Sequence, residues 1–310
     1  MALTVSEAEI ARILKYEQLI PAMEKALTAF SAGRVIQPVR NMLTIEEGKR
    51  FLGIMPAVAE DGMGAKLVCF YPKNAGTNVP THLATIMLFE PETGKPLAFL
   101  DGRLITEMRT AAVSAAVTKY LAPEHSKILT LLGSGVQARA HLAALRHTCH
   151  FEEVRVWSQT ADHARRFAEL YDAKAMDLEP AVRGADVLVT ATNAVEPFLR
   201  GEWLKPGAHV NAIGSPRPSW RELDDAAMHN PLIVDSREAV LKESGDVILS
   251  KAAIFAEAGE LFAGTKKLQR SETTIFKSVG IAIEDIAAAR LVYDAIEGSS
   301  SRENVAESPW

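Results

Sequence analysis

The sequence holds few cysteines, no excess of positive charge and no pattern of metal ligands. Two cysteines among 310 residues, Cys69 and Cys149, cannot form a disulfide framework and do not make a C-x-x-C pair. We therefore expect two ordinary thiols in a reducing compartment. The formal net charge of −5 argues against a nucleic-acid partner. The histidines and cysteines lack metal-ligand spacing, and no G-x-x-x-x-G-K-[ST] loop occurs, so neither a metal centre nor an NTPase is predicted.

Signals for export or membrane insertion are absent as well. No apolar run approaches the roughly 20 residues that a transmembrane helix needs. The first residues carry no basic stretch followed by an apolar segment, so no signal peptide is predicted. These absences predict a cytoplasmic protein with no membrane partner. With 48% hydrophobic residues over 310 positions, the chain has material for about two domains with packed cores.

The strongest positive signal spans residues 128–145. Five residues, all apolar except Thr130, predict a buried strand, and small and apolar residues at helical spacing follow a glycine turn. Between them stands the pattern G-x-G-x-x-A, formed by Gly133, Gly135 and Ala138. In this strand–turn–helix setting the pattern predicts a dinucleotide site: Gly133 permits the tight turn, Gly135 admits a pyrophosphate, and Ala138 lets the helix pack closely. A plain strand-to-helix connection is the alternative.

The chain on the two sides of this turn carries different patterns. Before it, turn residues separate short strands, which predicts a mostly antiparallel α+β arrangement with strands at 35–43, 50–57, 65–71, 84–89 and 96–101. After it, strands at 154–157, 185–190, 209–213 and 232–235 alternate with helices, among them 161–170, 236–244 and 252–258. This alternation predicts a Rossmann-type, doubly wound parallel sheet. We therefore expect an α/β protein with one domain at 1–120 and 283–310, and a dinucleotide-binding domain at 121–282.

The end of the second strand in this domain bears on the choice of nucleotide. An acidic side chain there would bind the ribose 2′-hydroxyl of NAD. Instead Ser158, Gln159 and Thr160 follow the strand. Ser158 and Thr160 can bind a 2′-phosphate, with Arg165 or Arg166 to assist, so NADP is favoured and NAD stays an alternative. An ordinary helix cap is the other interpretation of this segment.

Further segments share the pattern of one protein family. They are Gln37-Pro-Val-Arg40, Lys66-Leu-Val, Asp101-Gly, Arg109-Thr-Ala-Ala-Val-Ser-Ala, Gly133-Ser-Gly-Val-Gln137-Ala-Arg-Ala-His141, Asn211-Ala-Ile-Gly214, Trp220-Arg-Glu-Leu-Asp-Asp225, Asp235-Ser, Leu241-Lys-Glu-Ser-Gly-Asp-Val247 and Phe276-Lys-Ser-Val-Gly280. Over its whole length the chain resembles the ornithine cyclodeaminase/μ-crystallin family, and most closely the μ-crystallin branch of ketimine reductases. The resemblance implies a homodimer of two-domain subunits, in which residues 1–120 and 283–310 bind substrate and form dimer contacts.

The resemblance also implies which residues contact substrate and cofactor. Arg40, Lys66 and Arg109 are implied to hold a substrate carboxylate, a use that suits the fork of an arginine and the point charge of a lysine. The resemblance places the substrate under the nicotinamide. The implied cofactor contacts are His82, Arg109, Thr110, Gly133, Ser134, Gly135, Val136, Gln137, Ser158, Gln159, Thr160, Thr192, Asn193 and Ile213.

Three further side chains receive a role from the resemblance. Arg217 and Glu243 match substrate-site positions of the μ-crystallin branch, and Glu243 would stabilise a protonated imine. A helix-surface carboxylate is the alternative for Glu243. His82 would relay a proton, since a histidine titrates near neutral pH, and a purely structural histidine is its alternative.

One position departs from the cyclodeaminase pattern. Ornithine cyclodeaminases carry an Asp shortly after the Asn-Ala-x-Gly segment, and Pro216 stands there in this chain. Proline cannot relay a proton through its side chain, whereas the μ-crystallins also lack the acid and carry an arginine next to that position, as Arg217 does here. We therefore expect an NAD(P)H-dependent ketimine reductase.

The expected substrates are cyclic imino acids, Δ1-pyrroline-2-carboxylate and Δ1-piperideine-2-carboxylate, which would be reduced to proline and pipecolate. Two alternatives stay open. One is an ornithine or lysine cyclodeaminase, or an alanine dehydrogenase, of the same fold. The other is a protein that binds a thyroid-hormone-like carboxylic ligand together with NADP and catalyses no reaction.

Overall fold

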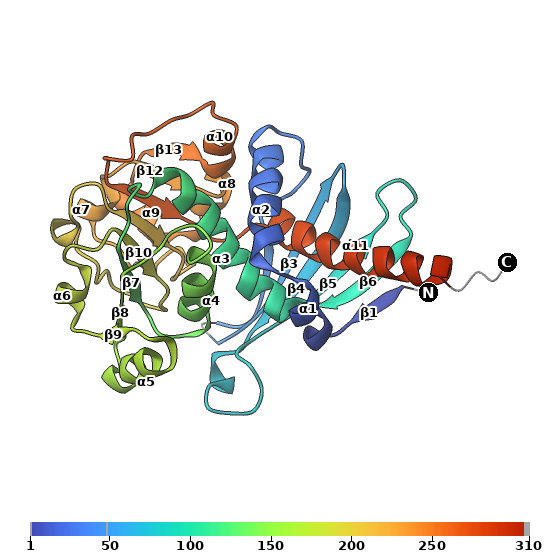
Figure 1. Cartoon of the computed structure of the whole chain (residues 1–310), viewed down its shortest axis with the longest axis horizontal. Coiled ribbons are helices and arrows are strands. Elements are labelled where there is room, and N and C mark those ends of the chain that lie inside the picture. The colour runs from blue at the N-terminus through green and yellow to red at the C-terminus, as the bar shows by residue number, and fades with distance from the viewer. Residues whose placement is uncertain (1, 48, 307–310) are drawn as a thin grey trace. The chain divides into compact units, whose positions relative to one another are not determined.

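The computed structural model describes residues 2–47 and 49–306, and packing divides the chain into two compact units (Figure 1). Unit 1 comprises Met1–Arg109 and Ile281–Trp310, and unit 2 comprises Thr110–Gly280. Helix α3 (Gly102–Leu121) carries the chain from the first unit into the second. Within the described residues, no helix is long and apolar enough to cross a membrane. The same residues contain no cluster of three or more His, Cys, Asp or Glu side chains that could hold a metal ion.

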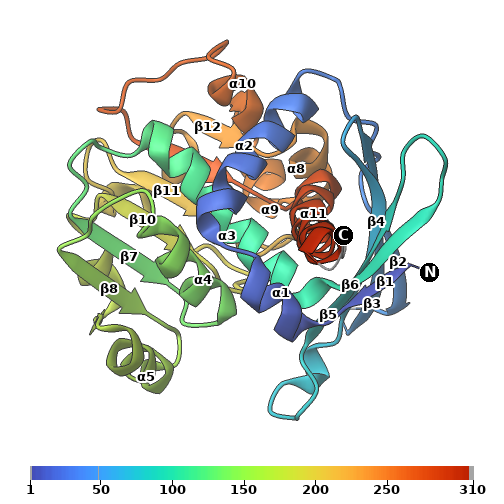
Figure 2. The same cartoon turned by 45° about the vertical axis from the view of Figure 1, so that its right-hand side comes forward.

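Unit 1 is built on a six-stranded sheet in the order β1-β6-β5-β4-β3-β2. Its strands are β1 (Leu3–Val5), β2 (Asn41–Glu46), β3 (Arg50–Ala59), β4 (Gly62–Phe70), β5 (His82–Phe89) and β6 (Pro96–Asp101). Neighbouring strands are antiparallel except for β1, which runs parallel to β6. The helices of the unit are α1 (Glu7–Ile13), α2 (Tyr16–Ser31), the short η1 (Pro72–Asn74) and α11 (Ala282–Ala306). Helix α11 packs on β3, β4 and β5 and against α2 (Figure 2), so it covers one face of the sheet.

The strand expected at 35–43 is wrong. Strand β2 begins at Asn41, and before it only Ile36 forms a bridge, to Val58. Pro38 accounts for the difference, because a proline has no N–H to donate to a sheet. The three-residue β1 was not expected, since alternation cannot be recognised over so short a segment. The strands expected between residues 50 and 101 form, with ends that differ by up to three residues.

Unit 2 holds an eight-stranded sheet in the order β13-β12-β14-β11-β10-β7-β8-β9, and all of its pairings are parallel. The strands are β7 (Ile128–Leu132), β8 (Glu153–Trp157), β9 (Lys174–Ala175), β10 (Val187–Thr190), β11 (His209–Ala212), β12 (Leu232–Val234), β13 (Ile254–Glu257) and β14 (Thr274–Lys277). Between them lie α4 (Val136–Leu145), α5 (Ala161–Tyr171), α6 (Leu178–Val182), η2 (Gly201–Trp203), α7 (Asp225–Met228), α8 (Arg237–Glu243), α9 (Gly245–Ser250) and α10 (Ala258–Phe262).

The strand order of this sheet confirms the expected doubly wound fold. From β7 the chain moves outward to β8 and β9, then returns to β10 on the other side of β7. The direction of winding therefore reverses between β7 and β10. In open α/β sheets, ligands bind beyond the carboxyl ends of the strands at such a switch point.

Strands β13 and β14 are among the elements of unit 2 that the sequence did not predict. The helix expected at 252–258 is wrong, because Ile254–Glu257 forms strand β13 at the sheet edge. Periodicity alone cannot distinguish a strand from a helix in so short an apolar segment. Strand β14 was not expected, although all four of its residues are buried between β11 and β12. Its sequence, Thr-Ile-Phe-Lys, includes two polar side chains and so lacks the continuous apolar run that marks a buried strand.

Candidate active site

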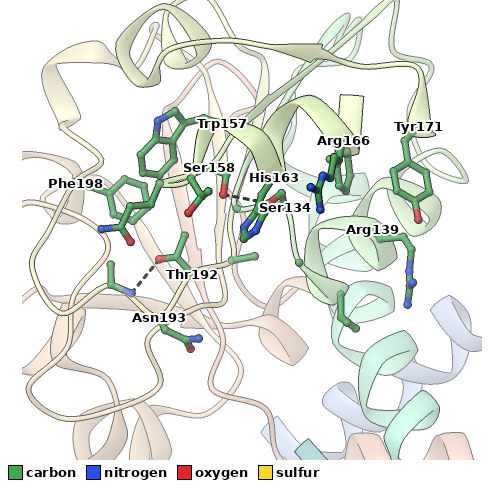
Figure 3. Close-up of a pocket in the computed structure, with 18 of the residues that line it drawn as sticks. Ser134, Arg139, Trp157, Ser158, His163, Arg166, Tyr171, Thr192, Asn193 and Phe198 are labelled. Atoms are coloured by element: carbon green, nitrogen blue, oxygen red, sulfur yellow. Dashed lines mark hydrogen bonds between the residues drawn. The ribbon is translucent and has the colours of Figure 1, made fainter. Parts of the chain in front are cut away.

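A cavity of about 1010 Å³ opens in unit 2 at the carboxyl end of β7, beside the glycine turn (Figure 3). Gly133 fixes this turn, since its N–H donates to the carbonyl of Trp157 (N to O, 2.8 Å). Its φ angle is +122°, and a Cβ at this position would lie 2.5 Å from the carbonyl oxygen of Ala191. Both the conformation and the lack of space therefore require glycine.

At Gly135, neither the backbone conformation nor contacts within the protein require glycine. Its φ of −86° is open to any residue, and a Cβ at this position would meet no heavy atom within 4 Å. The space next to Gly135 therefore belongs to the cavity. Gly135 is also the N-cap of α4, and no side chain caps this helix end. The free N–H groups and the positive end of the helix dipole suit an anion, so the turn fits the pyrophosphate of a dinucleotide.

Most of the expected cofactor residues come together around this cavity. Of the expected set, the lining includes Gly133, Ser134, Gly135, Val136, Ser158, Gln159, Thr160, Thr192 and Asn193. Two others from unit 2 are not part of it: Gln137 has a buried Oε1 without a hydrogen-bond partner, and Ile213 is buried directly after β11. Thr110 lies on α3 at the start of unit 2, and His82 and Arg109 belong to unit 1. The cofactor contacts of all these residues stay predictions.

Helix α5 contributes a cavity wall that the motifs did not indicate. His163, Arg166 and Leu170 line the cavity, and their spacing of three and four residues places them on one helix face. Leu170 is 75% exposed, so it offers open apolar surface. Val195 and Phe198 add further apolar lining from the segment after β10. Apolar walls with few polar groups are typical of cofactor pockets. Helical periodicity in 161–171 was the signal that could have found the α5 face.

The structure distinguishes the two arginines considered for a 2′-phosphate. Arg166 lines the cavity (Figure 3). Arg165 pairs instead with Asp162, and both of these side chains are well exposed. At the end of β8, the hydroxyl of Ser134 donates to that of Ser158 (3.1 Å). The polar group next to the glycine turn is therefore a pair of hydroxyls.

Glu222 ties together the backbone next to the cavity. Its carboxylate is buried and accepts hydrogen bonds of 2.6–3.0 Å from the hydroxyls of Thr190 and Thr192 and from the N–H groups of Thr192 and Gly214. Burial raises the pKa of this carboxyl group above its usual value. Because Thr192 lines the cavity, Glu222 fixes part of its wall.

Asp246 and Lys277 extend this buried network. Asp246 accepts from the N–H groups of Glu222 and Leu223 (2.8 and 3.0 Å). It also pairs with Lys277 (2.9 Å), and neither side chain is exposed. Lys277 donates to the carbonyl of Gly214 as well (2.7 Å). The loop after β11 is thus held in place by three segments, 220–225, 241–247 and 276–280. Each of them carries one of the sequence motifs shared with the family that the chain resembles.

Arg217 and Glu243 lie on two segments that touch. The N–H of Gly245 donates to the carbonyl of Arg217 (2.8 Å), and a Cβ on Gly245 would lie 2.2 Å from the carbonyl oxygen of Trp220. Glycine is therefore needed for this approach. The Arg217 guanidinium stacks on the Trp220 ring, 4.7 Å from its centre. Glu243 ends α8 and is half-buried, and Pro216 is exposed.

In unit 1, two of the three expected clamp cations meet in a buried ion cluster. The side chains of Lys66 and Arg109 are 2% and 4% exposed. Lys66 Nζ lies 2.6 Å from Asp285, and Arg109 donates to Asp285 (3.0 Å) and to Glu284. Burial lowers the pKa of Lys66 to about 8, although Asp285 opposes this shift. Arg40, the third cation, is near enough to lower the pKa of Lys66 too. The sequence did not indicate the two carboxylates.

His82 stands at the start of β5, also in unit 1. Its side chain is exposed, and its ring centre lies 4.5 Å from that of Phe70. Nδ1 is 3.1 Å from the hydroxyl of Thr81. An exposed ring can exchange protons with water, as a relay requires, and its role in the reaction stays a prediction.

We predict that alanine substitutions separate the roles of the two turn glycines. Gly135→Ala adds a methyl group that meets no protein atom, so stability should change by less than about 1 kcal/mol. NADPH affinity should fall at least ~10-fold, because the methyl group fills space that the pyrophosphate needs. Gly133→Ala should instead destabilise the protein by about 2 kcal/mol, through backbone strain and a clash with Ala191. Thermal unfolding and fluorescence titration with NADPH measure both effects, and unaltered NADPH affinity in Gly135→Ala would contradict a pyrophosphate at this turn.

Comparisons with known proteins agree over nearly the whole chain. The model of the ornithine cyclodeaminase/mu-crystallin family matches residues 1–300. The ketimine reductase mu-crystallin of Macropus fuliginosus is 50% identical over 287 residues, which cover 89% of this chain and 91% of the relative. The Δ1-pyrroline-2-carboxylate reductase of Thermococcus litoralis, solved with NADH and L-proline, gives a TM-score of 0.90 at 35% identity and covers 96% of this chain and 98% of its own. An archaeal alanine dehydrogenase dimer with bound NAD gives a TM-score of 0.90 at 32% identity, covering 96% and 97%. The chain therefore belongs to the ornithine cyclodeaminase/mu-crystallin family.

Proposed function

We propose that the protein is an NAD(P)H-dependent ketimine reductase. Its substrates are cyclic imines with a carboxylate on the imine carbon, Δ1-piperideine-2-carboxylate and Δ1-pyrroline-2-carboxylate, and its products are pipecolate and proline. The observation that carries the proposal is the buried pair of cations, Lys66 and Arg109, on a chain that also forms a dinucleotide cavity. The relatives support it, because their names describe a ketimine reductase and a Δ1-pyrroline-2-carboxylate reductase.

The chain's main task in this reaction is to hold the substrate by its carboxylate. We name Arg40, Lys66 and Arg109 the carboxylate clamp. The arginines offer paired N–H donors and Lys66 adds a compact charge. The nicotinamide supplies the hydride. Because the carboxylate is attached directly to the imine carbon, the clamp also fixes that carbon, and such positioning is the protein's principal contribution to hydride transfer.

The imine nitrogen must be protonated to accept a hydride readily. Glu243 is the carboxylate that stabilises the resulting iminium cation, since a half-buried negative charge attracts a cation more strongly than one in water does. Arg217 lies on the segment beside it and contributes to substrate binding. His82 relays the proton, because its exposed ring is open to solvent and an imidazole can both accept and donate a proton.

Pro216 argues against the cyclodeaminase alternative. Expulsion of ammonia requires a group that accepts and returns protons, and the exposed proline at this position has none. A substrate that arrives as a cyclic imine does not need this step. An alanine dehydrogenase has the same fold. The test therefore also measures amino-acid oxidation, the alternative reaction.

The test follows absorbance of the reduced nicotinamide after purified protein is mixed with Δ1-piperideine-2-carboxylate and either NADPH or NADH. We expect rapid oxidation of the cofactor and formation of pipecolate. No oxidation with either cofactor, together with NADH or ammonia formed from alanine or ornithine and NAD⁺, would replace the reductase by a dehydrogenase or cyclodeaminase. Quenching of NADPH fluorescence without oxidation would indicate a binding protein instead.

NADPH is the preferred cofactor in this proposal. The cavity lining includes three side chains that are positive or can become so, Arg139, His163 and Arg166, against one carboxylate among the described lining residues, Glu196. The three residues directly after β8, Ser158, Gln159 and Thr160, include no acid, and NAD-binding proteins bind the ribose hydroxyls with an acid at this point. A 2′-phosphate gains charge-assisted hydrogen bonds from arginine that a hydroxyl does not.

Arg166→Ala tests this preference. Loss of one charge-assisted hydrogen bond costs about 1.5–3 kcal/mol, so KM for NADPH should rise by roughly 10- to 100-fold, while KM for NADH should change less than about threefold. Steady-state kinetics with both cofactors measures this. Arg165→Ala is the matched control, because Arg165 pairs with Asp162 and does not line the cavity. Equal effects of Arg166→Ala on NADPH and NADH would refute a 2′-phosphate contact.

The protein forms a homodimer through the unit 1 sheet in this proposal. Lys66 faces α11, so Leu67, the next residue on β4, faces the opposite side of the sheet. The strand registers place Leu43, Leu83 and Phe99 on the same side. These four side chains are 37–47% exposed. A sheet face in contact with water normally carries polar residues, and a second copy would cover this apolar face symmetrically.

Leu67→Glu should weaken this dimer. A buried carboxylate without a partner is unfavourable, so we expect the dimer dissociation constant to rise at least ~10-fold, with monomers at low micromolar concentration in light-scattering chromatography. The control is Leu249→Glu on α9, a substitution of a 52% exposed leucine in unit 2, which should leave the dimer intact. A wild-type protein that is monomeric at all concentrations would overturn the proposed assembly.

A further inference from the structure

The acidic pair at the start of α11 has no role in the hydride transfer proposed above for the clamp and the nicotinamide. Glu284 and Asp285 stand in the first turn of α11, and neither side chain is exposed. They pair with two members of the carboxylate clamp: Asp285 with both Lys66 and Arg109, and Glu284 with Arg109. A substrate carboxylate bound by the clamp would lie near these two buried carboxylates, which would repel it. Their presence at this site therefore requires an explanation.

The backbone of β4 allows α11 to approach the clamp. Gly62 and Gly64 lie on the same strand face as Lys66, because side chains alternate along a strand. A Cβ at these two positions would come within 3.1 and 2.8 Å of Ile286. Without side chains there, the helix can lie directly on the strand. This close approach brings Asp285 within 2.6 Å of Lys66 Nζ.

The segment that carries the third cation is connected to the same helix end. Gln37, three residues before Arg40, accepts a hydrogen bond through its side-chain oxygen from the N–H of Ile283 (2.7 Å). This bond satisfies one of the N–H groups that the start of a helix leaves free. Arg40 itself lies within electrostatic range of Lys66. The three clamp segments therefore all meet the first turn of α11.

Cations and carboxylates face one another in this cluster. Glu284 and Asp285 pair with Lys66 and Arg109, and Arg40 adds a positive charge within electrostatic range of Lys66. Without Glu284 and Asp285, the buried cations would repel one another, and no carboxylate would offset the free-energy cost of removing their charges from water. Both carboxylates stand at the positive end of the α11 dipole, where a negative charge is favourable.

We propose that Asp285 and Glu284 are positioning residues of the carboxylate clamp: Asp285 keeps Lys66 charged and oriented, and Glu284 holds the guanidinium of Arg109. This inference rests on the proposed function, because the clamp takes its role in substrate binding from there.

Asp285 acts on the charge state of Lys66, whereas Glu284 pairs with Arg109. This matters because Lys66 can lose its proton within the neutral and alkaline pH range. Burial, together with the charges of Arg109 and Arg40, lowers the pKa of Lys66 to about 8, and Asp285 opposes them. The hydroxyl of Thr106, 3.5 Å from Nζ, is a neutral neighbour. Without the Asp285 carboxylate, Lys66 becomes neutral at a lower pH. Loss of the Glu284 carboxylate alters the surroundings of Arg109, whose guanidinium stays charged over the whole accessible range.

The test measures binding of picolinate, a planar ring acid, to the NADPH-loaded protein by calorimetry across neutral and alkaline pH. In the wild type, affinity should be constant below a pH of about 8 and fall above it, as Lys66 loses its proton. In Asp285→Asn this fall should begin at least about one pH unit lower, because an opposite charge at this distance shifts a pKa by 1–3 units. Glu284→Gln is the matched control: binding should weaken several-fold, with the fall at the wild-type pH.

Two results would overturn the proposal. One is a folded Asp285→Asn variant whose affinity falls at the wild-type pH. The other comes from Tm measurements. Asp285 also pairs with Arg109, so the test compares the effect of Asp285→Asn in two backgrounds: it should lower Tm less in Lys66→Met than in the wild type, and if Asp285→Asn alone does not fold, the double variant should fold. An equal or larger loss of Tm in the Lys66→Met background, or a double variant that also fails to fold, contradicts the pairing of Asp285 with Lys66. Absence of picolinate binding to the wild type would instead refute the proposed function, while the stability comparison would still test the ion pair.

Discussion

At the start of α11, two buried cations of the unit 1 sheet and its connecting helix meet two buried carboxylates. Lys66 and Arg109 are almost fully removed from water, which is unfavourable for a cation unless a carboxylate faces it. Glu284 and Asp285 provide that compensation from a single helical turn. A shift of β4 by one residue would turn Lys66 to the other face of the sheet. The cluster therefore ties the register of the sheet, the seating of α11 and the positions of the cations to one another.

Unit 2 is organised by backbone geometry more than by charge. The conformation of Gly133 sets the turn after β7, and the empty space at Gly135 lets the backbone serve as a binding surface. Glu222 then holds the neighbouring loops through four hydrogen bonds. Both units thus use buried carboxylates to fix polar groups, beside the cavity in unit 2 and at the proposed carboxylate clamp in unit 1. In unit 1 the fixed groups are side-chain cations, and in unit 2 they include backbone N–H groups.

Local patterns made the glycine turn beside the cavity predictable, because strand, glycines and helix are contiguous in the sequence. The same reasoning pointed to Ser158 and Thr160, which follow the next strand directly and line the cavity. It could not identify Glu284 or Asp285, since two acids at a helix start are also typical of an ordinary exposed helix end. Their meaning depends on contacts with residues more than 170 positions away. Strand β14 was missed for a related reason, since Lys277 is polar in sequence and is paired with Asp246 only in the folded chain.

The protein is proposed to recognise a cyclic imine by the carboxylate next to the reacting carbon. The decisive comparison is between kcat/KM for Δ1-piperideine-2-carboxylate and that for Δ1-piperideine, the same ring without the carboxylate. The lost charge-assisted hydrogen bonds are worth about 1.5–3 kcal/mol each, so the unsubstituted ring should be reduced at least ~100-fold less efficiently. Comparable efficiencies for the two rings would show that the cations of unit 1 do not bind the substrate.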